Sequence, residues 1–351
     1  MNTLAVGVMS GTSLDGIDIA LCRFSECGNG WNYQIIDAET VSYPSRWIEK
    51  LNNAPGLNAE DFLILHNEYG RYTGELIKEF LFNKESPKLV ASHGHTIFHQ
   101  PDKKFTFQLG NGASIAASTH ITTVCDFRNL DVALCGQGAP LVPIGDQLLF
   151  PEFDYCLNIG GFANISYELN GIRLAFDICP ANIILNELAR QKGNPYDLDG
   201  CIGASGIVNE SLLRKLNSLT YYYQKPPKSL GREWVNNQII PLLSQSGISL
   251  EDQSATIYEH IALQIAEVIN KSGRMLLTGG GAKNLFLIEK LKEKTPCQLI
   301  LPDEKLIDFK EALIFAFLGI LAFSGHVNVL SSVTGSAQDH VGGVIYPIEN
   351  K

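Results

Sequence analysis

Glycines, hydroxyls and carboxylates are concentrated directly after an apolar segment, residues 4–10, that we expect to form a strand. The run reads Gly11-Thr12-Ser13-Leu14-Asp15-Gly16-Ile17-Asp18. Glycines let backbone amides approach a phosphate group closely, and the two hydroxyls add hydrogen-bond donors. Asp15 and Asp18 each offer the oxygen ligands that Mg²⁺ prefers. Taken alone, these residues fit a phosphate-binding turn and an ordinary polar hairpin about equally well.

Two further glycine turns occur later in the chain. Asn158-Ile159-Gly160-Gly161 follows a predicted strand over residues 155–159, so its place matches that of the first turn and favours phosphate binding by both. Gly279-Gly280-Gly281 stands between a short buried strand and a helix near 284–292, an arrangement typical of an anion or nucleotide site. A tight structural turn is the alternative, and the dinucleotide pattern G-x-G-x-x-G is not completed.

Asp177 and a group of histidines are the other candidates. Asp177 stands between an apolar strand and a predicted helix near 181–191, where a carboxylate could act on a ligand. The residues alone favour a helix N-cap, because Asp is a common capping residue. His93, His95 and His99 have the spacing of metal ligands, but no further ligand set accompanies them. We therefore favour polar contacts of these histidines to a sugar or to the backbone.

Three hairpin-linked strands followed by alternating helices and strands are predicted twice along the chain. The first copy includes a helix near 59–82, capped by Asn58, whose apolar residues recur at spacings of three and four. We expect an α/β protein with two duplicated lobes, residues 1–140 and 141–334, and a tail near 335–351 that packs back on the first lobe. Ligands commonly bind in the cleft between two such lobes.

The composition limits the class of protein. The chain has 351 residues, enough for about two domains, and 45% of them are hydrophobic. Its formal net charge of -10 argues against nucleic acid or anionic lipid as a partner. The most apolar segment, residues 312–323, is shorter than the roughly 20 residues that span a bilayer. No two of the eight cysteines form a C-x-x-C pair, so we expect a reduced, cytoplasmic protein without a zinc or redox motif.

Motifs distributed over nearly the whole chain resemble those of the anhydro-N-acetylmuramic acid kinase family, which belongs to the sugar kinase, heat-shock ATPase and actin superfamily. The strongest motif is Val8-Met9-Ser10 together with the first glycine turn. The others are Ser92-His93-Gly94, Asp126-Phe127-Arg128, Gly136-Gln137-Gly138-Ala139-Pro140, Asn158-Ile159-Gly160-Gly161, Pro195-Tyr196-Asp197, Pro226-Pro227-Lys228-Ser229, Gly279-Gly280-Gly281-Ala282 and Lys310-Glu311-Ala312. The resemblance implies two actin-like, ribonuclease H-like lobes with an interlobe cleft.

The resemblance also implies an activity. The family uses ATP and water to open the 1,6-anhydro ring of a cell-wall amino sugar, and it forms N-acetylmuramic acid 6-phosphate. By motif, Gly11 to Asp18 would form the ATP phosphate loop. The Gly160 turn would be its counterpart in the second lobe, and the Gly279 turn would lie against the nucleoside.

The remaining roles implied by the resemblance concern the metal and the sugar. Asp15 or Asp18 would hold Mg²⁺, and Asp177 would be the catalytic residue, which overrides the preference for a cap. His93, Arg128 and Asn182 are the candidates for contacts to the sugar, and a homodimer stays open.

The segment around Asp177 departs from the family pattern. The family usually has Asp-Thr-Gly-Pro-Gly-Asn, whereas this chain has Asp177-Ile178-Cys179-Pro180-Ala181-Asn182. Because Cys179 and Ala181 tolerate positive φ poorly, we expect a different backbone here. Two alternatives therefore stay open: a kinase of the same fold that phosphorylates an ordinary sugar hydroxyl, and a non-catalytic nucleotide-binding switch.

Overall fold

The chain is described by a computed structural model for residues 2–11, 14–28 and 30–348, and it divides into two compact units. Unit 1 comprises residues 1–150 and 309–351, and unit 2 comprises residues 151–308. The chain therefore passes from one unit to the other twice, after Phe150 and after Asp308.

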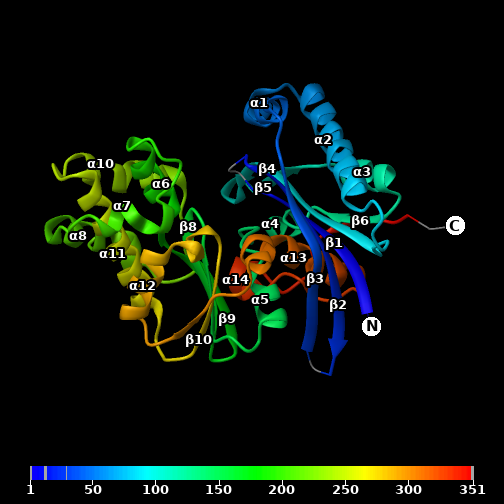
Figure 1. Ribbon diagram of the computed structural model, residues 1–351. Coiled ribbons are helices and arrows are strands. Elements are labelled where there is room, and N and C mark those ends of the chain that lie inside the picture. Colours follow the sequence, from blue (N-terminus) through cyan, green and yellow to red (C-terminus); the bar gives the residue numbers. More distant parts are fainter. Residues whose placement is uncertain (1, 12–13, 29, 349–351) are drawn as a thin grey trace. The chain divides into compact units, whose positions relative to one another are not determined.

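Unit 1 is built on a seven-stranded sheet with the order β12-β6-β4-β1-β2-β3 and with β5 paired to β4 (Figure 1). Strand β1 is antiparallel to β2 and parallel to β4. Its strands are β1 (Asn2–Ser10), β2 (Gly16–Cys27), β3 (Gly30–Ser42), β4 (Leu89–Gln100), β5 (Phe105–Leu109), β6 (Thr122–Cys125) and β12 (Val344–Tyr346). Its helices are α1 (Ser45–Asn53), α2 (Ala59–Phe80), α3 (Gly112–Thr119), α4 (Asn129–Ala133), α5 (Pro143–Leu149), most of α13 (Glu304–Phe323), α14 (Ser331–Thr334) and the short η1 (Ala54–Gly56) and η2 (Pro101–Lys103).

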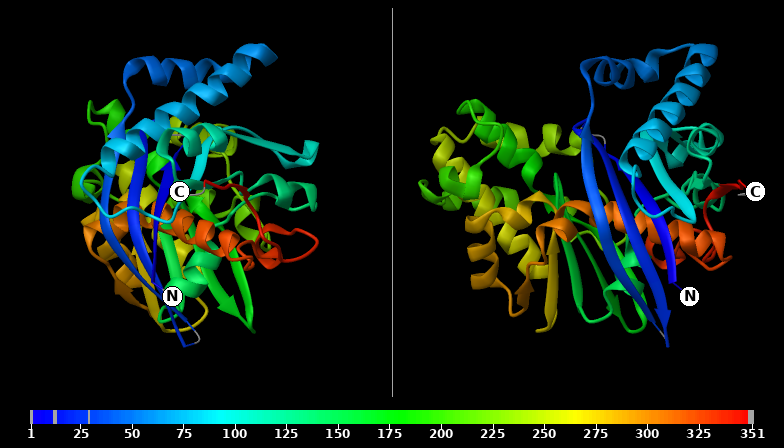
Figure 2. Two further views of the ribbon diagram at one scale, coloured as in Figure 1. Left: turned by 90° about the vertical axis from the view of Figure 1, so that its right-hand side faces the viewer. Right: turned by 45° about the vertical axis from the view of Figure 1, so that its right-hand side comes forward.

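Both faces of strand β1 are buried, and the two faces carry side chains of different size. Val6 and Val8 belong to a core cluster that includes Tyr69 of α2. On the other face, a Cβ at Gly7 would collide with the carbonyl group of Ala312 in α13. Strand alternation thus directs large residues toward α2 and leaves room for the close approach of α13, which lies across the sheet in orange in Figure 2.

Helix α13 contains the apolar segment that the sequence predicts as a buried helix. Leu313, Ile314 and Phe315 are at most 1% exposed, and Phe317 stacks on Phe24 of β2 with ring centroids 5.4 Å apart. Such burial explains the lack of a polar face on this helix. In the described part of the chain, no helix is both long and apolar enough to cross a membrane.

Unit 2 is built on a five-stranded sheet with the order β11-β10-β7-β8-β9. Its strands are β7 (Tyr155–Ile159), β8 (Phe162–Leu169), β9 (Ile172–Pro180), β10 (Arg274–Thr278) and β11 (Gln298–Ile300). Its helices are α6 (Asn182–Gln191), α7 (Cys201–Ala204), α8 (Glu210–Asn217), α9 (Arg232–Trp234), α10 (Ile240–Ser244), α11 (Leu250–Val268), α12 (Leu285–Lys294) and the short η3 (Leu198–Gly200), η4 (Thr220–Tyr223), η5 (Val235–Ile239) and η6 (Gly280–Lys283). Helices α6, α8, α11 and α12 share one apolar core with the sheet (Figure 1).

The two sheets have the same connectivity, which confirms the predicted duplication. In unit 1 the hairpin strands β1, β2 and β3 are followed by β4 and β6, which extend the sheet in parallel beyond β1. In unit 2 the strands β7, β8 and β9 are followed by β10 and β11 in the same arrangement. The first two glycine turns occupy equivalent positions, because one joins β1 to β2 and the other joins β7 to β8.

The boundaries of the units differ from the expected ones. Unit 1 continues to Phe150 rather than residue 140, because the ring of Phe150 lies 5.1 Å from that of Tyr33 in β3. The return to unit 1 begins at Phe309 rather than near residue 335, because α13 packs on the unit 1 sheet. Strand β12 then pairs with β6, as expected for a tail that packs back on the first unit.

Candidate active site

The turn between β1 and β2 contains the first group of predicted site residues. Gly11 is half-buried, Leu14 has a left-handed backbone with φ 62°, and Asp15 is exposed. Thr12 and Ser13, both predicted to bind phosphate, lie outside the described residues. The described part of the turn therefore offers a bend with an exposed carboxylate.

Three predicted phosphate-loop residues belong to strand β2 rather than to the turn. A Cβ at Gly16 would lie 2.5 Å from the carbonyl oxygen of Val41, so strand packing requires a glycine there. Ile17 is fully buried in the core, and its side chain cannot contact a nucleotide. Asp18 is half-buried and accepts a hydrogen bond of 2.6 Å from Oγ1 of Thr40 in β3.

A buried chain of hydroxyl groups lies beneath the turn, at the end of β1. Oγ of Ser10 is 2.6 Å from the hydroxyl of Tyr43 and 2.9 Å from Nδ1 of His95, and the hydroxyls of Tyr43 and Tyr69 are 2.5 Å apart. Burial lowers the pKa of His95 to about 4, so the ring is neutral near pH 7. This chain links β1, β4 and α2 at the residue that precedes Gly11.

His93 and Arg128, both predicted to contact the sugar, form a pair in unit 1. The guanidinium Nε of Arg128 donates a hydrogen bond of 3.0 Å to Nε2 of His93, and Nη1 donates to the carbonyl oxygen of Gly138 at 2.6 Å. Since Nε2 accepts, the proton of His93 is on Nδ1, which lies 2.8 Å from the carbonyl oxygen of Gly94. Burial first, and the Arg128 charge next, lower the pKa of His93 well below its ordinary value. His93 is therefore a neutral support for Arg128.

Glu311 of α13 is a further carboxylate, and the residue types around it predict no role for it. Loss of solvation is the main cause that raises its pKa, and the charge of Asp18 raises it further, whereas Lys310 and Arg128 lower it. The side chain of Glu311 keeps access to solvent. Its signal in the sequence is the motif Lys310-Glu311-Ala312, which belongs to the family resemblance.

In unit 2 the glycines of the two turns divide into two kinds. Gly279 and Gly281 are required by the fold, because a Cβ on either one would collide with Ile159, and Gly279 also has φ 79°. By contrast, a Cβ at Gly160, Gly161 or Gly280 would meet no atom closer than 3.7 Å, and none of these three has a positive φ. Neither packing nor backbone conformation explains glycine at these three positions, which suits the close approach of a ligand.

Asn182 connects the two turns of unit 2 and lines a pocket beside them. Its Nδ2 donates to the carbonyl oxygen of Ile159 at 3.3 Å and lies 3.9 Å from the position of a Cβ on Gly280. The pocket has a volume of about 380 Å³. Its lining is formed by Asn182, Leu185, Asn186, Tyr196, Asp197, Leu198, Asp199, Tyr258, Gly280, Lys283 and Asn284. The exposed side chains of Tyr196 and Leu198 give the pocket an apolar wall.

One wall of this pocket is held by a buried polar network. Both carboxylate oxygens of Asp197 accept backbone hydrogen bonds, from Ile202 at 2.8 Å and from Gly203 at 3.1 Å. The Tyr258 hydroxyl donates to Asp197 Oδ2 at 3.0 Å and accepts from Nδ2 of Asn284 at 2.8 Å. Asn284 is also the N-cap of α12, so the network joins the pocket wall to α11 and α12.

Asp177 lies within β9, which continues to Pro180, so the cap that the residues alone favoured is excluded. The N-cap of α6 is Ala181, without a side-chain hydrogen bond. Oδ2 of Asp177 instead accepts a hydrogen bond of 2.9 Å from the backbone amide of Leu230. Burial raises the pKa of Asp177, and the Leu230 hydrogen bond opposes that shift. Oδ1 accepts no hydrogen bond from the described residues, which leaves one oxygen available for a water molecule or substrate.

Comparison with known proteins identifies the family of this chain. The family model described as "Anhydro-N-acetylmuramic acid kinase" matches residues 3–348. The chain belongs to the anhydro-N-acetylmuramic acid kinase family. A protein of that name from Pseudomonas syringae pv. tomato is 35% identical over 99% of this chain and 100% of its own length. One from Xanthomonas oryzae pv. oryzae is 34% identical over 98% of this chain and 97% of its own length. The predicted family is thus confirmed.

The departures from the pattern of the anhydro-N-acetylmuramic acid kinase family around Asp177 are absorbed by the core of unit 2. Ile178, Cys179 and Ala181 are at most 2% exposed and belong to one apolar cluster. None of them has a positive φ, and Ala181 has φ -128°. The side chains that replace glycine and threonine therefore fill the core without a left-handed backbone.

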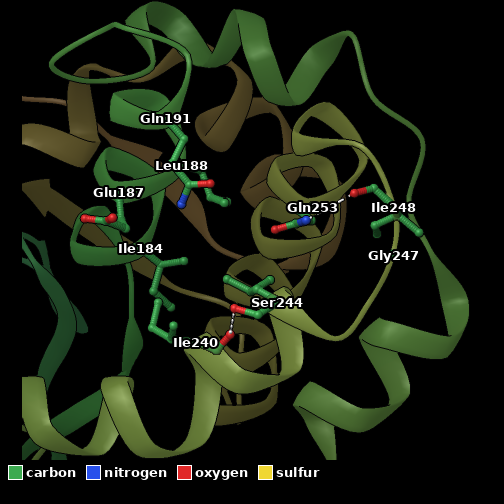
Figure 3. A pocket seen from close by; sticks show the side chains of 10 residues that line it. Ile184, Glu187, Leu188, Gln191, Ile240, Ser244, Gly247, Ile248 and Gln253 are labelled. Atoms are coloured by element: carbon green, nitrogen blue, oxygen red, sulfur yellow. Dashed lines mark hydrogen bonds between the residues drawn. The ribbon is translucent and has the colours of Figure 1, made fainter.

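A second pocket in unit 2, of about 170 Å³, contains none of the predicted site residues (Figure 3). Ile184, Leu188 and Leu243 form its apolar part, and Glu187 and Gln191 of α6 stand at its edge. Gln253 is held by a hydrogen bond of 3.1 Å from its Nε2 to the carbonyl oxygen of Ile248. This pocket lies on the α10 side of α6.

Proposed function

We propose that this protein is an anhydro-N-acetylmuramic acid kinase, which opens the 1,6-anhydro ring of its substrate with water and phosphorylates the released oxygen to give N-acetylmuramic acid 6-phosphate. The observation that carries the proposal is the family match over residues 3–348. A carboxylate with one uncommitted oxygen, Asp177, supports it. The product would re-enter amino sugar metabolism, so the enzyme would serve in recycling of the cell wall.

We propose that the nucleotide is ATP and that its phosphates bind at the glycine turns. Gly160, Gly161 and Gly280 leave space that the protein itself does not fill, and the adjoining pocket of about 380 Å³ has an apolar wall for a base. Asn182 lines this pocket, so we assign it to the nucleotide rather than to the sugar. In unit 1, Gly11 stays a candidate for a phosphate contact, as the family motif implies.

Carboxylates in unit 1 fit the preference of Mg²⁺ for oxygen ligands. Asp15 is exposed at the first turn, and Asp18 is half-buried beside it. Within the described residues, no group of three or more His, Cys, Asp or Glu side chains forms a metal site by itself. In kinases, Mg²⁺ is usually bound by one or two carboxylates together with substrate phosphates, and the ion neutralises phosphate charge.

Asp177 would act as a general base toward water. Its Oδ2 is held by the Leu230 amide, and Oδ1 would accept a proton from a water molecule that attacks the anomeric carbon. The C1–O6 bond of the anhydro bridge would then break, and O6 would attack the γ-phosphorus of ATP. The bond from that phosphorus to ADP would break, so that ADP leaves and O6 carries the phosphoryl group in place of a proton. The raised pKa of Asp177 suits a base that must also release its proton afterwards.

The location of the activity follows from the chemistry. We propose that the enzyme is cytoplasmic, because ATP is available there and because all eight cysteines are free thiols.

An ADP-release assay with the anhydro sugar, with the ring-opened sugar and without sugar tests the function, and mass spectrometry of the product identifies the ester. Turnover with the ring-opened sugar alone would favour an ordinary sugar kinase. Nucleotide binding without sugar-dependent turnover would favour a nucleotide switch.

A further inference from the structure

The loop between η4 and α9, residues 224–231, carries an ammonium group in an unusual environment. Lys228 is half-buried, and its Nζ lies 4.6 Å from the ring centroid of Tyr221 and 5.7 Å from that of Phe176. Nζ donates one hydrogen bond, of 3.2 Å, to the carbonyl oxygen of Tyr221. An ammonium has three donors, so two remain for other partners.

Lys228 has no carboxylate partner within 4.0 Å among the residues that the structure describes. Other enclosed lysines do have one: Nζ of Lys310 lies 2.6 Å from Asp146, and both side chains of that pair are 5% exposed. A cation that is partly removed from water without a counter-ion costs free energy, and burial lowers the pKa of Lys228 accordingly. Neighbouring aromatic rings offset only part of this cost. The site is therefore electrostatically incomplete without an anion.

Hydrogen bonds hold the loop segment around Lys228 against Asp177. The backbone amide of Asp177 donates to the carbonyl oxygen of Lys228 at 3.2 Å, and two residues further Leu230 donates to the Asp177 carboxylate at 2.9 Å. The Tyr221 hydroxyl donates to the carbonyl oxygen of Asp177 at 2.6 Å, and the Tyr221 carbonyl accepts from Lys228. These four hydrogen bonds hold the segment that carries the ammonium against the strand that carries the proposed base.

We propose that Lys228 binds the carboxylate of the muramic acid substrate and so selects this sugar over its glucosamine counterpart. The inference rests on the proposed function. A muramic acid differs from glucosamine by a lactyl ether that ends in a carboxylate, a fixed anion that matches the missing counter-ion. The γ-phosphate of the nucleotide is the other anion in the reaction. That phosphate is assigned to the glycine turns, whereas Asp177, whose backbone amide donates to the carbonyl oxygen of Lys228, is proposed to act on the sugar.

The test compares two anhydro sugars that differ only in the lactyl group: 1,6-anhydro-N-acetylmuramic acid and 1,6-anhydro-N-acetylglucosamine. For the wild type and for Lys228→Met, which keeps the alkyl stem over Tyr221, kcat and KM are measured by ADP release. We expect kcat/KM for the acidic sugar to fall about 10- to 100-fold, the size of a lost charged hydrogen bond. For the glucosamine sugar it should change less than about twofold, which a merely structural role of Lys228 would not produce.

Three further measurements complete the experiment. Lys225→Met changes an exposed lysine of the same loop and should have no effect on either sugar. Lys228→Arg keeps the charge and should retain a preference for the acidic sugar; it also serves if Lys228→Met does not fold. Calorimetry with a non-hydrolysable ATP analogue should give the same Kd for wild type and Lys228→Met.

The outcomes are distinct. Equal losses on both sugars would overturn the proposal and leave Lys228 as a support for Asp177, and a weakened ATP analogue would instead assign it to the phosphates. If the wild type turned over neither sugar, the proposed function would fail. Calorimetric titration of the two sugars would then judge Lys228 alone, because only the acidic sugar should bind more weakly to Lys228→Met.

Discussion

The backbone amide of Leu230 donates a hydrogen bond of 2.9 Å to Oδ2 of Asp177, and this contact fixes which carboxylate oxygen is free to react. Leu230 is on a loop, whereas Asp177 is inside a strand, so the orientation of the proposed base depends on a segment far away in the sequence. Positioning of this kind favours a single rotamer of Asp177 and leaves Oδ1 without a hydrogen bond from the described residues.

Replacement of this carboxylate tests its role directly. Asp177→Asn keeps the shape and can still accept the Leu230 hydrogen bond, but it cannot take a proton from water. We expect kcat to fall by roughly 10²–10⁴-fold, with ring opening and phosphorylation lost together. The Kd of ATP should be unchanged, since Asp177 is not among the residues that line the nucleotide pocket. In water labelled with oxygen-18, the label should enter the anomeric hydroxyl; label in the phosphate ester would contradict the assignment.

The pH dependence of turnover should reflect the burial of Asp177. Burial raises its pKa, and only the ionised form accepts a proton, so kcat should decline as pH falls through this raised pKa. The effect on stability has the opposite sign: a carboxyl group with a raised pKa in the folded state loses stability as pH rises through that pKa. A pH–rate profile together with urea titrations of wild type and Asp177→Asn checks both. An acid limb no higher than that of an exposed Asp would contradict the prediction.

Glycines that face open space should matter for nucleotide binding and not for folding. Gly160→Ala brings a Cβ to within ordinary contact distance of Asn158 and should fold normally, but the Kd of ATP should rise about tenfold or more. Gly279→Ala should instead destabilise the protein by about 1–3 kcal/mol, because φ 79° and ψ 164° suit glycine alone. Gly56→Ala, which meets no neighbour, is the control for both measurements. Unchanged ATP affinity in folded Gly160→Ala would remove this turn from the site.

The hydroxyl chain beneath the first turn should support ATP binding. Tyr43→Phe removes one oxygen and leaves the Ser10 and Tyr69 hydroxyls without their shared partner, which should cost about 1–3 kcal/mol of stability. If the chain also positions Gly11, the KM for ATP should rise while kcat changes less. Tyr72→Phe is a matched control, since Tyr72 stacks on Trp47 without a hydroxyl bond among the described residues. Equal effects of the two substitutions would rule out a specific role.

His95 should make the protein sensitive to acid. Its pKa is about 4 in the folded state against 6.5 as the ordinary value, so the unfolded chain takes up the proton first. Stability from this residue is complete above pH 6.5 and is lost as pH falls toward 4, by about 3 kcal/mol in all. Thermal denaturation of wild type and His95→Gln over this range measures the difference, and parallel pH curves for the two proteins would contradict it.

Local patterns predicted much of the fold, because they depend on neighbouring residues. The helix over 59–82 is observed as α2, and Asn58 caps it by accepting from the Asp61 amide at 3.0 Å. The end of β9 was not predictable in this way. Cys179 extends the strand because it pairs with Ala163 in β8. This pairing between distant residues decides whether Asp177 lies within a strand or caps a helix, and the local sequence does not show it.

Within the candidate site, the glycine turns were recognisable and their supports were not. Ser10, Tyr43 and His95 come from three separate segments, so no spacing in the sequence could reveal their hydrogen bonds. The same holds for Leu230 and Asp177. The motif containing Lys228 was visible, but its lack of a counter-ion depends on the three-dimensional packing.

The discontinuity of unit 1 has a consequence for the order in which the protein is made. A ribosome adds residues from the N-terminus, so β1 to β6 are synthesised first. Gly7 in β1 packs against α13, and β6 pairs with β12, and both of these partners are synthesised much later. Unit 2 is one continuous segment and can close its core before either element exists. Unit 2 can therefore complete its fold before unit 1, whose sheet keeps one β1 face and the β6 edge uncovered until α13 and β12 emerge.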